Sequence, residues 1–168
     1  MTEAFGEASD GGALWRFSVA FYGRPGVSEA LIALQDGAGR DVNLMLYALW
    51  HGVSVGGRLS DEELATAERI ARPLRVEVVE PLRALRRKLR AHPDADAQRL
   101  REGIKVIELA AEKVIQSRLG GLARPVAGDS GGRAAAAVAN FRLYLGPELA
   151  CSAPAAAVAQ ALEAFLAE

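Results

Sequence analysis

Asn43, Tyr47 and His51 interrupt an otherwise apolar stretch and recur every four residues, with Trp50 beside the last of them. On a helix this spacing places the three side chains on one face, so polar groups are drawn into or near an apolar interior. An imidazole can act as acid, base or ligand near neutral pH, and Asn43 with Gln35 could orient a small polar molecule. One interpretation is therefore a polar binding pocket.

The same residues also fit a purely structural interpretation. Buried polar side chains need hydrogen-bond partners, and Gln35, Asp36 and Asp41 lie shortly before the apolar stretch. A hydrogen-bonded network would then hold two neighbouring helices as an antiparallel hairpin. We prefer this interpretation, because a lone histidine without a matched nucleophile or second ligand is no catalytic set. The candidate binding residues are Gln35, Asp41, Asn43, Tyr47 and His51. No catalytic residue, metal site or cofactor is predicted.

The chain has one basic cluster, between residues 83 and 90. Arg83, Arg87 and Arg90 share a helix face there and could bind the phosphates of nucleic acid. The alternative is a solvated helix end whose cations suit the helix dipole and pair with acids of the next helix. No aromatic residue stands within the cluster, so we prefer the alternative and expect no nucleic acid partner.

The composition is that of an ordinary globular domain. The chain has 168 residues, 51% hydrophobic and 24% charged, and a formal net charge of −1. A domain of this length buries roughly 70% of its unfolded surface without disulfides or metals. Cys151 is the only cysteine, so no internal disulfide can form. The acidic start does not resemble a signal peptide, and no apolar run reaches the roughly 18 residues of a membrane span. We expect a cytoplasmic protein that does not bind membranes.

The apolar run at about 42–53 is the expected centre of the fold. A helix that is apolar on all sides must be buried on most of its surface, so amphipathic helices should pack around it. No stretch alternates as a strand would. The periodicity predicts an all-α, single-domain bundle of seven or eight helices over 13–168. A disordered tail is expected at 1–12, and a flexible linker at about 122–133 before two C-terminal helices.

Residues 61–120 are predicted to form heavily charged helices. Pro73 should end or kink the first, and Pro81 should bend its continuation, because proline removes a backbone donor and crowds the preceding turn. The following long helix is expected to turn six apolar residues toward the core: Leu100, Ile104, Ile107, Ala111, Val114 and Ile115.

Several short motifs resemble those of a family of uncharacterised bacterial proteins of about this length. They are Pro25-Gly26-Val27 after Tyr22, Leu34-Gln35-Asp36, Asp41-Val42-Asn43-Leu44, and Trp50. A weaker match runs from Glu80 to Arg86, so the resemblance covers about residues 14–90. It implies an intact helical domain with no assigned activity, and it favours Gln35, Asp41 and Asn43 over Tyr47 and His51 for any site common to the family.

Three functions remain in competition. The leading hypothesis is a non-enzymatic protein-interaction or scaffold role, with a protein partner or a second copy of the chain bound through free aromatic surface near Trp15, Phe17 and Phe21. The second is a small-metabolite binding protein or enzyme with a polar site around Gln35, Asp41, Asn43 and His51. The third is nucleic-acid binding through Arg83–Arg90.

Overall fold

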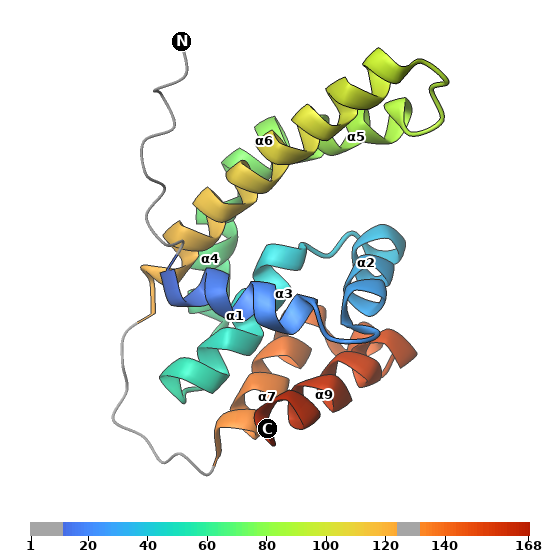
Figure 1. The fold of residues 1–168 in the computed structure, drawn as a ribbon. Coiled ribbons are helices and arrows are strands. Elements are labelled where there is room, and N and C mark those ends of the chain that lie inside the picture. Colours follow the sequence, from blue (N-terminus) through green and yellow to red (C-terminus); the bar gives the residue numbers. More distant parts are fainter. Residues whose placement is uncertain (1–11, 124–131) are drawn as a thin grey trace.

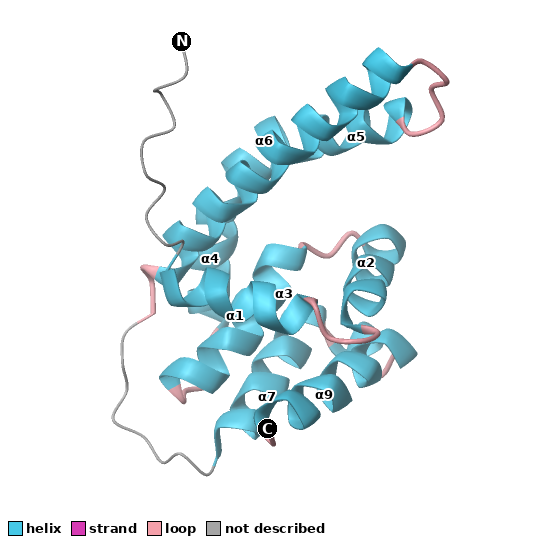
Figure 2. Cartoon of the chain, viewed as in Figure 1, coloured by secondary structure: helices cyan, strands magenta, loops and turns pink. Residues whose placement is uncertain are grey.

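The computed structural model describes residues 12–123 and 132–168, which are almost entirely helical (Figures 1 and 2). The all-α prediction is confirmed, since no strand occurs in this part of the chain. The predicted tail at 1–12 lies outside the described residues except for Gly12, and the predicted linker at 122–133 is described only at its ends. The helices are α1 (Gly12–Tyr22), α2 (Val27–Ala38), α3 (Val42–Trp50), α4 (Asp61–Leu74), α5 (Glu80–Leu89), α6 (Ala95–Gly120), α7 (Arg133–Leu145), α8 (Pro147–Ala150) and α9 (Ala153–Leu166).

Helix α3 is the buried apolar helix that the sequence predicts. Asp41 caps its start, because one carboxylate oxygen accepts a hydrogen bond from the Asn43 backbone N–H at 2.7 Å. Every residue from 43 to 50 is buried. The helix then widens into the π-helical segment η1 (His51–Val55). Gly56 caps the end of η1 with a φ of 80°. At that angle glycine is the favoured residue.

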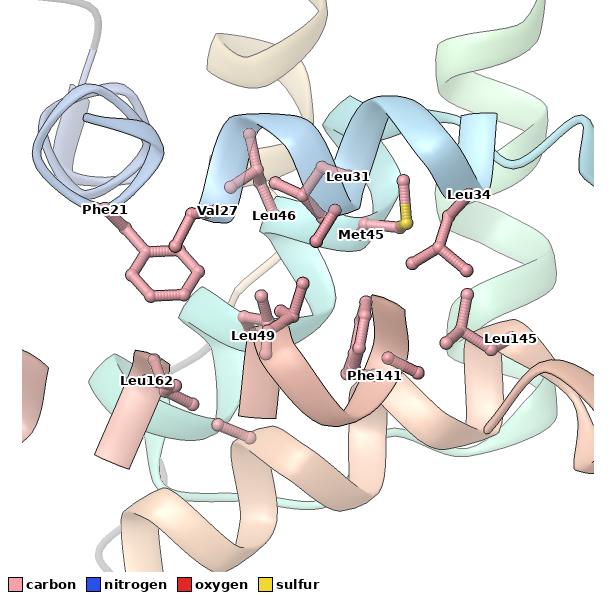
Figure 3. Packing of buried hydrophobic residues seen from close by; sticks show 14 residues of the cluster. Phe21, Val27, Leu31, Leu34, Met45, Leu46, Leu49, Phe141, Leu145 and Leu162 are labelled. Atoms are coloured by element: carbon pink, nitrogen blue, oxygen red, sulfur yellow. The ribbon is translucent and has the colours of Figure 1, made fainter. Parts of the chain in front are cut away.

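Two apolar clusters lie on opposite sides of α3. Met45, Leu46 and Leu49 pack into the first cluster with side chains of α1, α2, α7 and α9, among them Phe141 and Leu162 (Figure 3). Other α3 residues, including Leu44 and Tyr47, pack into the second cluster with α1, α4 and α6. The apolar surface of α3 therefore divides the remaining helices into two groups that cover it.

A long helical arm leaves the body beside α3. Helix α4, the π-helical segment η2 (Arg75–Val79) and α5 follow one another without a break, and the first part of α6 runs back along them, clear of the body (Figure 1). Ser60 and Glu63 form a capping box at the start of α4. Pro73 lies inside α4 and does not end it. The wider π-helical turns of η2 come directly before Pro81, whose missing N–H and ring disturb the hydrogen bonds of the preceding turn.

The outer half of α6 does not face the core as predicted. Ile115 is fully buried, but Leu100, Ile107 and Val114 are 65%, 52% and 44% exposed. The prediction is wrong for these three residues. The first part of α6, with Leu100 and Ile107, extends beyond the body, where α5 covers only one of its sides (Figure 1), and Val114 lies on an uncovered side of the helix although its neighbour Ile115 is buried. Periodicity identifies an apolar stripe but not whether a neighbouring helix reaches it.

The aromatic residues near the start of the chain are also placed differently from the expectation. The rings of Phe17 and Phe21 stack with centroids 5.6 Å apart, and Phe165 of α9 packs against both. Phe21 is fully buried. The expectation of free aromatic surface is wrong for Phe21, and Phe17 is partly buried because Phe165 of α9 packs against it.

A close approach between backbones makes Gly52 necessary to this packing. A Cβ at Gly52 would lie 2.2 Å from the backbone nitrogen of Ala137 in α7. We expect Gly52→Ala to lower the free energy of unfolding by about 2 kcal/mol or more, because two packed backbones must separate. Gly37→Ala in α2 is the control, since a Cβ there would meet nothing within 4 Å. Urea unfolding that finds the two variants equally stable would contradict this account.

Candidate functional site

Asn43 is buried at the start of α3, where its Oδ1 accepts a hydrogen bond from Nε2 of Gln116 in α6 at 2.9 Å. Gln35, near the end of α2, accepts a hydrogen bond on its side-chain oxygen from Nη1 of Arg83 at 2.7 Å. Both residues therefore lie where the body meets the arm. The structure brings this part of the predicted polar set together, with partners that come from α5 and α6.

Asp41 has a mainly structural environment. Besides capping α3, its carboxylate pairs with Arg75 at 3.2 Å, and Arg75 also binds Glu68 at 2.5 Å. The hydrogen bonds to Glu68 are the largest of the effects that raise the pKa of Arg75. The Asp41 backbone N–H donates to the Tyr144 hydroxyl at 2.9 Å, and burial raises the pKa of Tyr144 to about 12. Asp41 thus ties α3 to the arm and to α7.

Tyr47 and His51 lie apart from Gln35 and Asn43. Tyr47 is 2% exposed within the second apolar cluster, and burial raises its pKa to about 12. His51 is 6% exposed, and its Nδ1 lies 3.3 Å from the Gly57 carbonyl oxygen. Burial lowers the pKa of His51, which favours the neutral imidazole. Neither side chain lines either of the two cavities described below.

The predicted basic face is largely paired with acids. Arg83 donates to Glu108 at 3.0 Å and to Glu112 at 2.7 Å, and Arg87 binds Asp36 at 2.8 Å. Arg90 is exposed near the end of α5. Pairing with acids of the next helix is what the solvated-face interpretation expects. Arg83 and Arg87 also reach α2, so they connect the arm to the body.

A cleft of about 470 Å³ opens where α1, α2 and α3 meet the arm. We call it the interhelical cleft. Its apolar lining comes from six side chains: Trp15, Val19, Ile32, Val42, Leu46 and Leu109. Its uncharged polar lining comes from five: Ser18, Tyr22, Gln35, Asn43 and Gln116. Its charged edge belongs to the arm: Arg83, Arg86, Arg87, Lys105, Glu108 and Glu112. A mostly apolar hollow with a few convergent polar groups is the usual form of a small-molecule site.

Two residues that line this cleft each have a buried polar atom without a partner. Ser18 and Gln116 are each 3% exposed, and neither Ser18 Oγ nor Gln116 Oε1 has a hydrogen bond within the described residues. Leaving a buried polar atom unpaired costs about 1–3 kcal/mol, so such atoms call for an explanation. The hydrogen bond from Gln116 Nε2 to Asn43 fixes the orientation of the Gln116 amide. An amide oxygen can only accept a hydrogen bond, so the missing partner of Gln116 Oε1 must be a donor.

The pKa values of the two acids at the edge of the cleft are shifted in opposite directions. Burial would raise the pKa of Glu108, but hydrogen bonds from Arg86 and Arg83 outweigh it and the pKa is lowered. For Glu112 burial dominates and the pKa is raised. Within the described part of the chain, only one Glu112 oxygen has a hydrogen bond, from Arg83. The pKa of Tyr22 is also raised, first by burial and then by the charge of Glu112.

Beside the interhelical cleft lies a smaller cavity of about 230 Å³. Arg83, Arg87, Gln35 and Asn43 line both hollows, so these side chains form the wall between them. The acids Asp41 and Glu80 also line the smaller cavity, which makes it a poor site for an anion despite its arginines.

Sequence reasoning missed Ser18, Glu108, Glu112 and Gln116. A signal was present, because Glu108, Glu112 and Gln116 recur every four residues, as Asn43, Tyr47 and His51 do. Ser18 and Tyr22 are likewise four apart on α1. Each set shares a helix face, but sequence spacing does not say that the two faces meet.

Among the described residues, no three side chains of His, Cys, Asp or Glu gather as they would around a metal ion. The helices in residues 12–123 and 132–168 are too short or too polar to cross a bilayer.

The fold and the cleft define an all-helical protein with a small-molecule-sized hollow at the base of a helical arm. Residues 13–119 match the family described as "Protein of unknown function (DUF2390)", and the chain belongs to that family. The matched region contains every residue that lines the interhelical cleft. No curated protein and no solved structure matches the chain significantly. The expected relation to a family of uncharacterised proteins is thus confirmed at the level of the family.

The side chain of Glu108 is 8% exposed and accepts hydrogen bonds from two arginines. We expect Glu108→Gln to lower the free energy of unfolding at pH 7 by about 2 kcal/mol, because two partly buried cations lose their carboxylate. The folded-state pKa of Glu108 is lowered, so its carboxylate stabilises the fold above the unfolded pKa of about 4.3. That contribution is lost as the pH falls through the folded pKa.

The measurement is urea unfolding of both proteins between about pH 3 and pH 7. The stability difference should shrink toward the acid end. Glu102→Gln is the control, because the Glu102 side chain is 59% exposed and its ion pair is with the neighbouring Arg101. A difference that does not change with pH would contradict this assignment.

Proposed function

We propose that this protein binds a small organic molecule in the interhelical cleft. The observation that carries the proposal is the pair of buried, unpaired polar atoms, Ser18 Oγ and Gln116 Oε1, which belong to two side chains that line this hollow. A bound molecule that supplies a hydrogen bond removes the cost of those atoms at the moment of binding. The proposal keeps Gln35 and Asn43 as site residues and replaces Asp41, Tyr47 and His51 with residues of α1 and α6.

The lining indicates the chemistry of the ligand. Gln116 Oε1 and the second oxygen of Glu112 are acceptors without a donor among the described residues. Glu112 is four residues before Gln116, so both lie on one face of α6. The aromatic side chains of Trp15 and Tyr22 line the opposing α1 side. We infer a ligand with an apolar body and an N–H donor, such as an amine, because aromatic faces also attract ammonium groups.

Three probes with one apolar body separate the head groups: 2-phenylethylamine, 2-phenylethanol and 3-phenylpropionate. Ligand-observed NMR should show the amine binding most tightly, with a Kd of about 0.1–1 mM, as expected for a molecule of this size.

Ser18→Leu should weaken binding of the amine at least tenfold, because the larger side chain enters the cleft. The melting temperature of this variant is measured in parallel and binding is compared below it, because leucine at a position that is 3% exposed can overpack the interior. Ser54→Leu at an exposed position is the control.

Two results would overturn the proposal: no binding by any probe, or binding that Ser18→Leu leaves unchanged. Preference for 3-phenylpropionate would retain the cleft but exclude the amine, and would assign the head group to the arginines at its edge.

The affinity for 2-phenylethylamine should also depend on pH. Burial raises the pKa of Glu112, and the ionised carboxylate is the form that attracts an ammonium group. Binding should therefore weaken as the pH falls through the raised pKa of Glu112, and Glu112→Gln should remove this dependence. An affinity for the amine that does not vary between about pH 4 and pH 8 would place the ammonium group elsewhere.

A protein-interaction role is the second candidate, supported by a different surface from the one the sequence suggested. Leu100, Val106, Ile107 and Val114 of α6 are each at least 44% exposed. Scattered exposed apolar residues are common, but this group lies along one helix of a projecting arm. We propose that a protein partner binds to these exposed apolar side chains of α6.

A further inference from the structure

Six exposed residues of α6 form a regular stripe. Leu100, Ile107 and Val114 recur every seven residues, and so do Gly103, Ala110 and Ser117, each three positions later. All six are exposed. None of the charged residues of α6 falls at these positions, although the helix is rich in them. A seven-residue apolar repeat is the pattern by which two helices pack along their length.

Large and small side chains alternate along this stripe in a self-complementary way. If a second α6 lies antiparallel to the first, with the two-fold axis between residues 108 and 109, Leu100 faces Ser117 of the second copy. In the same register Ile107 faces Ala110, and Val114 faces Gly103. Every large side chain then meets a small one, as close packing requires. A parallel pairing would instead set Gly103 against Gly103 and leave gaps.

Gly103 gives an independent indication of close approach by another molecule. It lies inside the 26-residue helix α6, where glycine costs up to about 1 kcal/mol relative to alanine. The chain itself does not require it, because a Cβ at this position would meet nothing within 4 Å. A second helix at this point would require it, since small residues let helix backbones approach.

We propose that two copies of the chain associate through antiparallel pairing of this α6 face. The inference deepens the protein-interaction candidate by naming the partner, and it is independent of ligand binding in the cleft. Val106, which is 67% exposed, lies beside the centre of the pairing and adds apolar surface. Two of the flanking cations are engaged within the chain, Arg99 with Asp96 and Lys113 over the Trp15 ring, while Arg118 beside Ser117 is exposed.

The size of the contact predicts its strength. Residues 100–117 span about 27 Å of helix, which buries less than the roughly 1,600 Å² of a standard interface. We therefore expect a dimer that dissociates at micromolar concentrations. Sedimentation velocity from about 5 to about 500 µM should show the mass rising from 17.8 kDa toward twice that value. A monomer at every concentration would overturn the proposal.

Gly103→Leu separates dimerisation from folding. Its side chain would clash with Val114 of the second copy at both ends of the contact, so the dimer should weaken at least about tenfold. The melting temperature of the dilute monomer should rise by about 2–4 °C, because a helix interior loses a glycine. Gly37→Leu, at a helical glycine of α2 that also has open space, is the control and should leave the dimer intact. A dimer that tolerates Gly103→Leu would exclude this face.

Disulfide trapping tests the orientation. In a Cys151→Ser background, mixed Leu100→Cys and Ser117→Cys chains should cross-link to each other, whereas Leu100→Cys alone should not. Cross-linking of Leu100→Cys to itself would overturn the antiparallel register. Binding of 2-phenylethylamine should be unaffected by Gly103→Leu, so a failure of the cleft proposal and a failure of the dimer can be told apart.

Discussion

The burial of α3 is the constraint on which the rest of the structure depends. A nine-residue helix that is apolar on every side cannot leave any face in water, so it needs cover from two directions. Helices α2, α7 and α9 cover one side, and α4 and α6 cover the other, while α1 contributes to both. The polar residues at the start of α3, Asp41 and Asn43, are thereby held at the boundary between the two groups of helices.

At this boundary the helices are connected by ion pairs and hydrogen bonds between side chains, in addition to apolar contacts. Arg83 reaches Gln35 on the body and Glu108 and Glu112 on α6, so one guanidinium joins three helices. Such pairs contribute little when exposed, but these side chains are each about one-fifth exposed or less, so loss of one partner is costly. The network connects the arm to α2, and the interhelical cleft lies beside this connection, where α1, α2 and α3 meet the arm.

The arm explains why two surfaces of α6 have different properties. Toward the body, Glu108, Glu112 and Gln116 bring polar atoms into a sheltered hollow, where an unpaired acceptor has an energetic cost. Away from the body, the stripe that contains Leu100 and Ile107 is uncharged and open to solvent. A helix buried within the bundle would show neither feature, since its polar atoms would be paired and its apolar atoms covered.

Local sequence determined the helices, the capping of α3 by Asp41 and the capping box at Ser60, because these depend on residues within one turn of each other. It also determined that the run at 42–53 is buried. Only the tertiary structure decided that Asn43 meets Gln116, 73 residues away, while Tyr47 packs into the second apolar cluster and His51 lies beside the Gly57 carbonyl. A spacing of four residues shows that side chains share a helix face, but burial and partners depend on which distant helix covers that face, and helical periodicity carries no information about that.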